Sequence, residues 1–327
     1  MNIRTFRNLL RRDLNFGLLL LACAMLVLAL LHPYVRLQHD AFDYLVVVDI
    51  TQSMNTLDYR QRSKPVSRLV FVKQALEQAL PRLPCGSKIG LGIFTEYRSF
   101  VLFEPVEVCA NYREISTTLA NIDGRMAWVG SSEIAKGLYS GLRTARSLPD
   151  LPALVFITDG QEAPPVNPHH RPVLDGKPGE AKGVIIGAGS FVPMPIPKFD
   201  PDGRPLGYWR ADEVLQTDTY SLGRGASVEG EKMVETDEAP VVSLGATPGS
   251  EHLSSLRESY LKLLAKETGL SYRRLGSPAD LIAALKDHAL AQQQTMSADL
   301  AWIPTLLALL CFVGVYGIPA SYRSKSV

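Results

Sequence analysis

The chain lacks the signatures of the common nucleotide-binding and hydrolytic enzymes. Its 327 residues contain no Gly-rich phosphate loop of the Walker type and no nucleophile-elbow motif. No paired general base has a clear position, so a metal-activated hydrolase is also a weak alternative. These absences exclude a P-loop ATPase and a serine hydrolase of the α/β type. We therefore expect a protein that is not an enzyme.

A surplus of positive charge is also missing. Of the 34 basic and 33 acidic residues, six basic and one acidic lie at the two chain ends. The remaining 28 basic and 32 acidic residues give the part between them a net charge of −4. This balance argues against nucleic acid as a partner. No long repeat or extended low-complexity tract interrupts this part, and its length suits one α/β domain with an insertion.

Cysteine is scarce, with four residues, two of them inside the apolar end segments. Of the other two, Cys85 precedes the apolar run 88–94 and Cys109 follows the run 99–104. The short turn between these runs predicts a hairpin, whose open ends lie close together. In an oxidising compartment the two thiols would form a disulfide. The alternative is two unrelated core residues. His169-His170 has no spaced third ligand, which makes a zinc site improbable.

Two uncharged segments have the composition of membrane-spanning helices. Residues 16–35 form the first and residues 301–322 the second, which has aromatic residues near its ends. A cleaved signal peptide is the alternative for the first segment, but no small-x-small cleavage site precedes His32. We therefore expect two transmembrane helices.

The flanking charges predict the orientation. Residues 1–15 form a basic tail, and the short tail 323–327 is also basic. Such flanks stay in the cytoplasm, so the part between the spans would lie on the outer side of the membrane.

Residues 42–293 alternate between strand and helix patterns, which predicts a doubly wound, mostly parallel six-stranded sheet covered on both faces. The turn of about four residues before 99–104 makes that strand antiparallel, at an edge. Residues 161–180 are expected to be a loop, and residues 190–250 an insertion. The expected strands are 44–48, 88–94, 99–104, 153–158, 183–189 and 271–275, and the expected helices are 63–83, 115–122, 132–146, 253–267 and 278–293.

Oxygen-bearing side chains follow the ends of these strands. Asp49, Thr51 and Ser53 leave the first strand together, and Asp159 follows the strand 153–158. Ser132 precedes a helix, with Ser131 as the neighbouring alternative. In a doubly wound sheet these loops share one edge, and carboxylate and hydroxyl oxygens suit a hard divalent cation. We expect Mg²⁺, with Ca²⁺ and Mn²⁺ as alternatives, and an open coordination position for an Asp or Glu of a partner protein.

These three motifs resemble the metal-ion-dependent adhesion site of von Willebrand factor A domains. In that family the first motif is Asp-x-Ser-x-Ser, the second a Thr and the third an Asp. Thr51 stands where Ser is usual and Ser132 where Thr is usual, and both keep the hydroxyl group. A degenerate domain that binds no metal is the alternative.

Segments 49–55, 197–209 and 261–275, with the two expected spans, are similar to A-domain proteins of the bacterial inner membrane. The resemblance extends to those encoded beside periplasmic methanol dehydrogenase, which implies a periplasmic domain that assists assembly or calcium insertion of that enzyme. Aerotolerance-type stress proteins are the alternative group. An adaptor for a separate ATPase, of the chelatase or remodelling kind, is another.

The insertion leaves its strand at the same edge as Asp49 and Asp159. A long loop at such an edge is usually functional, so we expect it to contact the same partner as the metal. The alternative is a solvated excursion packed on its own domain. Residues 200–203 (Asp-Pro-Asp-Gly) resemble a calcium loop but lack the later ligands, and we interpret them as a turn. Glu162 is interpreted as a solvated side chain, and the alternative is a contact with the site near Asp159.

Overall fold

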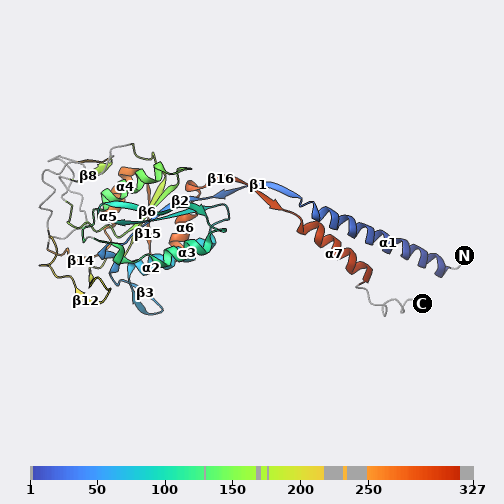
Figure 1. Cartoon of the computed structure of the whole chain (residues 1–327), viewed down its shortest axis with the longest axis horizontal. Coiled ribbons are helices and arrows are strands. Elements are labelled where there is room, and N and C mark those ends of the chain that lie inside the picture. Colours follow the sequence, from blue (N-terminus) through green and yellow to red (C-terminus); the bar gives the residue numbers. More distant parts are fainter. Residues whose placement is uncertain are drawn as a thin grey trace. The chain divides into compact units, whose positions relative to one another are not determined.

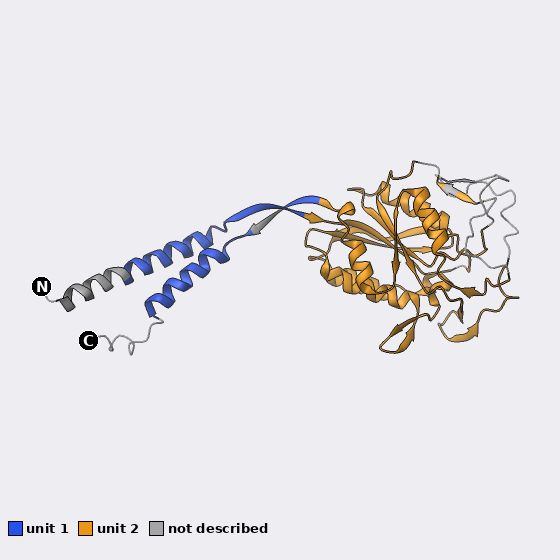
Figure 2. Ribbon diagram, turned by 180° about the vertical axis from the view of Figure 1, so that it is seen from behind, with its two compact units in different colours: residues 1–39, 293–327 blue, residues 40–292 orange. Residues whose placement is uncertain are grey.

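The computed structural model describes residues 3–128, 130–166, 171–174, 177–216, 231–233 and 249–316. The chain divides into two compact units, which Figure 2 distinguishes by colour. Unit 1 comprises residues 1–39 and 293–327, and unit 2 comprises residues 40–292. His169-His170 lies outside the described residues.

Unit 1 contains two helices that lie side by side (Figure 1). The helix α1 (Ile3–Leu30) and the helix α7 (Trp302–Tyr316) hold most of the two segments that were predicted to span a membrane. Strands β1 (Tyr34–Ala41) and β16 (Gln292–Asp299) pair with each other. Among the described residues, no helix combines the length and the hydropathy that a membrane crossing requires.

Unit 2 is built on a six-stranded sheet with the order β15-β9-β7-β2-β5-β6. Its first five strands are parallel, and β6 lies antiparallel to β5 at one edge. The predicted mostly parallel sheet with one antiparallel edge strand is therefore confirmed. Its strands are β2 (Asp43–Asp49), β5 (Lys88–Thr95), β6 (Arg98–Glu107), β7 (Ala153–Thr158), β9 (Gly183–Ala188) and β15 (Ser271–Leu275).

Helices cover both faces of this sheet, because alternate residues of each central strand point to opposite sides. In β2, Val46 and Val48 belong to the core on the side of α2, α3 and α6. Leu45 and Val47 face α4 and α5 instead. The helices are α2 (Arg68–Ala79), α3 (Tyr112–Asn121), α4 (Ile134–Ser147), α5 (Glu258–Thr268) and α6 (Pro278–Leu285).

Short elements complete unit 2. Its described residues include the short 3₁₀ helices η1 (Gln52–Asn55), η2 (Leu80–Arg82), η3 (Gly124–Met126) and η4 (His288–Leu290). The paired short strands are β3 (Tyr59–Gln61) with β4 (Lys64–Val66), β8 (Pro172–Leu174) with β13 (Glu231–Met233), β10 (Met194–Pro195) with β14 (Leu253–Ser254), and β11 (Pro197–Phe199) with β12 (Pro205–Tyr208). The turn between β11 and β12 contains residues 200–203, where Gly203 N donates to Asp200 O over 2.9 Å, so the predicted turn is confirmed.

Three predicted helices begin or end at least five residues away from their predicted bounds, because tertiary contacts decide these ends. The segment predicted to open a helix at residue 63 forms the hairpin β3-β4 instead, and α2 begins only after Ser67, whose Oγ accepts from Val70 N. Residues 253–257 are not helical, since Leu256 N and Arg257 N donate to carbonyl oxygens of distant residues. The last predicted helix, 278–293, ends at Leu285 and is followed by η4 and β16.

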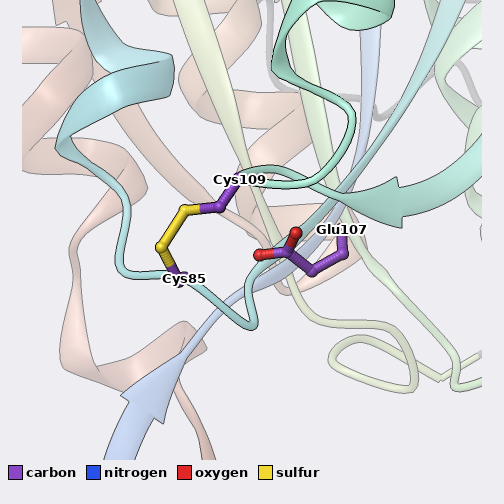
Figure 3. Close-up of side chains that lie close together, drawn as sticks. All are labelled: Cys85, Glu107 and Cys109. Atoms are coloured by element: carbon purple, nitrogen blue, oxygen red, sulfur yellow. A yellow bond between two sulfur atoms is a disulfide. The ribbon is translucent and has the colours of Figure 1, made fainter.

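The predicted disulfide between Cys85 and Cys109 is present (Figure 3). Their Cα atoms lie 5.4 Å apart at the open end of the β5-β6 hairpin. Glu107 lies beside them and accepts from Gly86 N over 2.7 Å. Because the two sulfur atoms are bonded to each other, this group of three residues offers no thiolate to a metal ion.

Candidate metal centre

The two predicted carboxylates lie at the point where the strand order of the sheet reverses. From β2 the chain continues outward through β5 and β6, and it then returns to β7 and continues outward through β9 and β15. Asp49 ends β2, and Asp159 directly follows β7, its neighbour. Ligands of open α/β sheets bind at the carboxyl ends of strands at such a switch point. The sheet therefore brings the first and third motifs together.

Asp49 is completely buried and fully hydrogen-bonded. Its Oδ1 accepts from Thr51 N over 2.8 Å and from Thr51 Oγ1 over 2.7 Å. Its Oδ2 accepts from Thr158 Oγ1 over 2.6 Å. Burial raises the pKa of Asp49 to about 7, and the charge of Asp159 contributes in the same direction, while the hydrogen bonds oppose it. A nearby positive charge would therefore favour the ionised form of Asp49.

The three predicted hydroxyl ligands are also buried, with at most 6% of any of them exposed. Thr51 Oγ1 lies 3.4 Å from Ser53 Oγ. Ser132 is fixed beside the loop that follows β7, because its N and O atoms hydrogen-bond to Ala163 over 2.7 and 2.8 Å. Ser132 Oγ has no hydrogen-bond partner among the described residues. A buried hydroxyl without a partner is costly, and a cation at this edge would satisfy it.

Asp159 has partners for both of its carboxylate oxygens. Oδ1 accepts from Gln161 N over 2.9 Å. Oδ2 accepts from Arg68 Nη1 and, over 3.1 Å, from Ser254 Oγ. Asp159 therefore resembles Asp49, whose two oxygens also have partners, and either carboxylate keeps further lone pairs for a cation or its water.

Arg68 was not among the predicted site residues, and its guanidinium group is completely buried. It donates from Nε and Nη2 to Asp58 Oδ2 over 2.9 and 2.7 Å, in addition to its bond with Asp159. A Cβ atom at Gly189, where φ is +131°, would lie 2.9 Å from Arg68 Nε, so only glycine fits there. A signal was present in the sequence, because Arg68 is four residues before Val72 and so lies in phase with the buried stripe of its helix.

The charges of this site fit a divalent cation. When ionised, Asp49, Asp58 and Asp159 carry three negative charges, and Arg68 supplies one positive charge. The remaining formal charge of −2 would be neutralised by a divalent cation. Carboxylate and hydroxyl oxygens are ligands that Mg²⁺ and Ca²⁺ prefer. Both the charge and the unpaired Ser132 hydroxyl are thus compatible with the predicted ion.

The interpretation of Glu162 as solvated is wrong. Only 8% of this residue is exposed. Its carboxylate accepts from Ile134 N over 2.8 Å, from Ala135 N over 3.1 Å and from Tyr260 Oη over 2.5 Å. It therefore caps the first turn of α4, which follows Ser132. Burial raises the pKa of Glu162 to about 7, and the Tyr260 hydrogen bond opposes that shift.

The described part of the insertion lies beside the loop that follows β2 and contains Thr51 and Ser53, here called the metal loop. This is the edge of the sheet at which the insertion was predicted to leave its strand. A cavity of about 640 Å³ is lined by Gln52, Trp128 and the turn at residues 200–203. A second cavity, of about 240 Å³, is lined by Gln52, Ser131 and Trp209. Gln52 lies between the predicted ligands Thr51 and Ser53, so both cavities adjoin the candidate metal centre.

No family model matches the chain, and no curated protein does. Similar solved structures include an aerotolerance-related membrane protein from Bacteroides fragilis, with 17% identity, coverage of 75% of this chain and 96% of that chain, and a TM-score of 0.47. A von Willebrand factor type A protein from Catenulispora acidiphila has 15% identity, covers 45% of this chain and 34% of that chain, and has a TM-score of 0.28. The manganese-loaded TRAP protein of Plasmodium vivax has 9% identity, covers 81% of this chain and 82% of that chain, and has a TM-score of 0.36. The strand order and the site of this chain define its class, which is an open, doubly wound α/β protein with a polar site at the switch point.

Proposed function

We propose that the chain is a metal-dependent protein-binding module rather than an enzyme. Asp49, Thr51, Ser53, Ser132 and Asp159 would hold a divalent cation, most favourably Mg²⁺, directly or through water, with Asp159 fixed by Arg68. When bound, the ion supplies a coordination position for a carboxylate of a client protein. The observation that carries this proposal is the buried, unpaired Ser132 Oγ at the edge where the charged network has a formal charge of −2.

We further propose that the module is anchored in a bacterial inner membrane by segments 16–35 and 301–322, with unit 2 in the periplasm. The disulfide between Cys85 and Cys109 supports an oxidising compartment. The proposed client is a methanol dehydrogenase, whose assembly or calcium insertion the module would assist. This narrower role rests on the resemblance of segments 49–55 and 197–209.

The experiment is capture of purified methanol dehydrogenase by the full chain in detergent, with Mg²⁺ or with chelator. Asp49→Ala should abolish capture in Mg²⁺ to the level seen with chelator, whereas Glu77→Ala, on the exposed side of α2, should not change it. Capture that resists both Asp49→Ala and chelator would refute the metal-dependent mechanism. If calorimetry shows Mg²⁺ binding but methanol dehydrogenase is not captured, the proposed metal site stands and this client is refuted.

A further inference from the structure

The smaller cavity beside the metal loop has mostly apolar walls and an acidic end. It has a volume of about 240 Å³, which suits one side chain rather than a folded segment. Gln52 and Ser131 contribute from the metal loops, and the insertion contributes Trp209 and Leu215. Three glutamates also line it: Glu162, Glu213 and Glu251.

Two of these glutamates are already engaged. Glu162 accepts three hydrogen bonds at the start of α4. Glu213 accepts from Lys198 Nζ over 2.6 Å and from Arg210 N over 3.1 Å. Both carboxylates therefore already accept hydrogen bonds from the domain itself, and Glu213 is also paired with a positive charge.

Glu251 differs from the other two. Only 6% of it is exposed, and its Oε1 has no hydrogen-bond partner among the described residues. Its Oε2 forms a buried ion pair with Arg257 Nη2 over 3.6 Å, a distance longer than a normal hydrogen bond. Burial raises the pKa of Glu251, and the charge of Arg257 opposes this shift. A hydrogen-bond donor that enters the cavity would stabilise this buried, unpaired carboxylate oxygen.

Another unpaired acceptor belongs to Gln161, which contacts Glu251 but does not line the cavity. Gln161 is 3% exposed, and its Nε2 donates to Glu251 O over 3.1 Å. Gln161 Oε1 has no partner among the described residues. The unpaired oxygen of Glu251, a residue that lines the cavity, favours an occupant that donates a hydrogen bond and carries positive charge. The apolar walls, which include Val214 and Leu215, suit the aliphatic stem of such a side chain.

We propose that this cavity binds a basic side chain, Lys or Arg, of the client, and that Glu251 selects its positive charge. This proposal rests on the proposed function, because it places a basic residue of the client next to the carboxylate that would reach the ion. The client surface would then present one acidic and one basic side chain. An acidic side chain would meet the unpaired oxygen Oε1 of Glu251 and is disfavoured in the cavity.

The test uses Trp209 as a reporter, since it lines the cavity. In the full chain with Trp128→Phe and Trp302→Phe, Trp209 is the sole remaining tryptophan. The probes are two acetylated, amidated peptides that contain Glu and either Lys or norleucine, which keeps the stem and removes the charge. Binding is followed by Trp209 fluorescence in Mg²⁺, for unchanged Glu251 and for Glu251→Gln.

The expected result is that the Lys peptide binds about tenfold more tightly than the norleucine peptide, and that Glu251→Gln removes this difference. Glu213→Gln, at a carboxylate that Lys198 already pairs, should leave the preference intact. An equal affinity for both peptides, or a preference that survives Glu251→Gln, would overturn the proposal.

A further variant separates this proposal from the proposed function. Asp49→Ala should weaken both peptides alike and leave the Lys preference in place. If Asp49→Ala has no effect while the preference for Lys persists, the metal-dependent mechanism fails and the cavity assignment stands. If Asp49→Ala weakens binding but the two peptides never differ, the cavity assignment fails alone.

Discussion

Arg68 and Asp159 form an ion pair in which neither side chain is exposed to solvent. The same guanidinium group also binds Asp58 and, through Nη1 over 2.6 Å, Ser254 Oγ. Ser254 belongs to β14, which pairs with β10, and Asp58 Oδ2 accepts from Ser190 N over 2.8 Å. One buried arginine therefore connects the candidate metal centre with both ends of the insertion.

Replacing Arg68 should strongly destabilise the protein. Arg68→Met would leave Asp58 and Asp159 buried without their cation, and we expect a loss of about 3–5 kcal/mol in the free energy of unfolding. Urea unfolding of the full chain in detergent measures this loss. Arg82→Met, at an exposed position after α2, is the matched control and should change stability by less than about 0.5 kcal/mol. A similarly small change for Arg68→Met would show that the pair is not a structural element.

Removing the hydroxyl of Ser132 should affect metal binding more than folding. In metal-free buffer Ser132→Ala removes a buried group without a partner, so stability should stay within about 0.5 kcal/mol or rise. Mg²⁺ affinity, measured by calorimetry, should fall by about tenfold because a ligand is lost. Ser131→Ala tests the neighbouring alternative, and a larger loss of affinity in that variant would move the ligand assignment to Ser131.

The buried Glu162 should make stability fall as pH rises. Its pKa in the folded protein is about 7, compared with 4.5 for an ordinary glutamate. Between these values the folded state binds more protons than the unfolded state, so the free energy of unfolding decreases as the pH increases from about 4.5 to 7. The contribution is about 1.4 kcal/mol for each unit of pKa difference.

Glu162→Gln should reduce this decrease in stability between pH 4.5 and 7. Part of the decrease should remain, because burial also raises the pKa values of Asp43 and Asp49. Urea unfolding at several pH values in metal-free buffer provides the measurement. Glu114→Gln, at an exposed position of α3, should leave the slope unchanged. An identical slope in Glu162→Gln and in the unchanged chain would contradict the assignment.

Loss of the disulfide should lower stability through the unfolded state. Cys85 and Cys109 are 24 residues apart, and closing a loop of this size contributes about 3 kcal/mol in the chain-entropy treatment. The double variant Cys85→Ser/Cys109→Ser should therefore unfold at lower urea concentration, and reductant should have no further effect on it. The unchanged chain should lose the same stability in reductant; equal stability with and without reductant would mean that the bridge contributes nothing.

The bounds of an element could be predicted accurately where neighbouring residues alone define them. The strands β7 and β15 have the predicted bounds, since a short apolar run between turn residues defines a buried strand. The starts of α2 and α5 could not be predicted, because they depend on a hairpin and on hydrogen bonds to distant carbonyl groups. Periodicity indicates which face of a segment is apolar. It does not indicate where distant residues form hydrogen bonds with the backbone and so end a helix.

By itself the sequence determined the alternation of strands and helices, the antiparallel edge strand, the hairpin that joins Cys85 to Cys109, and the residue types offered to a cation. Only the tertiary structure decided that Arg68 pairs with Asp159, that Glu162 caps α4 and that Glu251 and Gln52 line the same cavity. The physical reason is that side-chain chemistry and local period are properties of neighbouring residues. The burial and the pairing of a charge depend instead on segments that are far apart in the chain and meet only when the sheet is assembled.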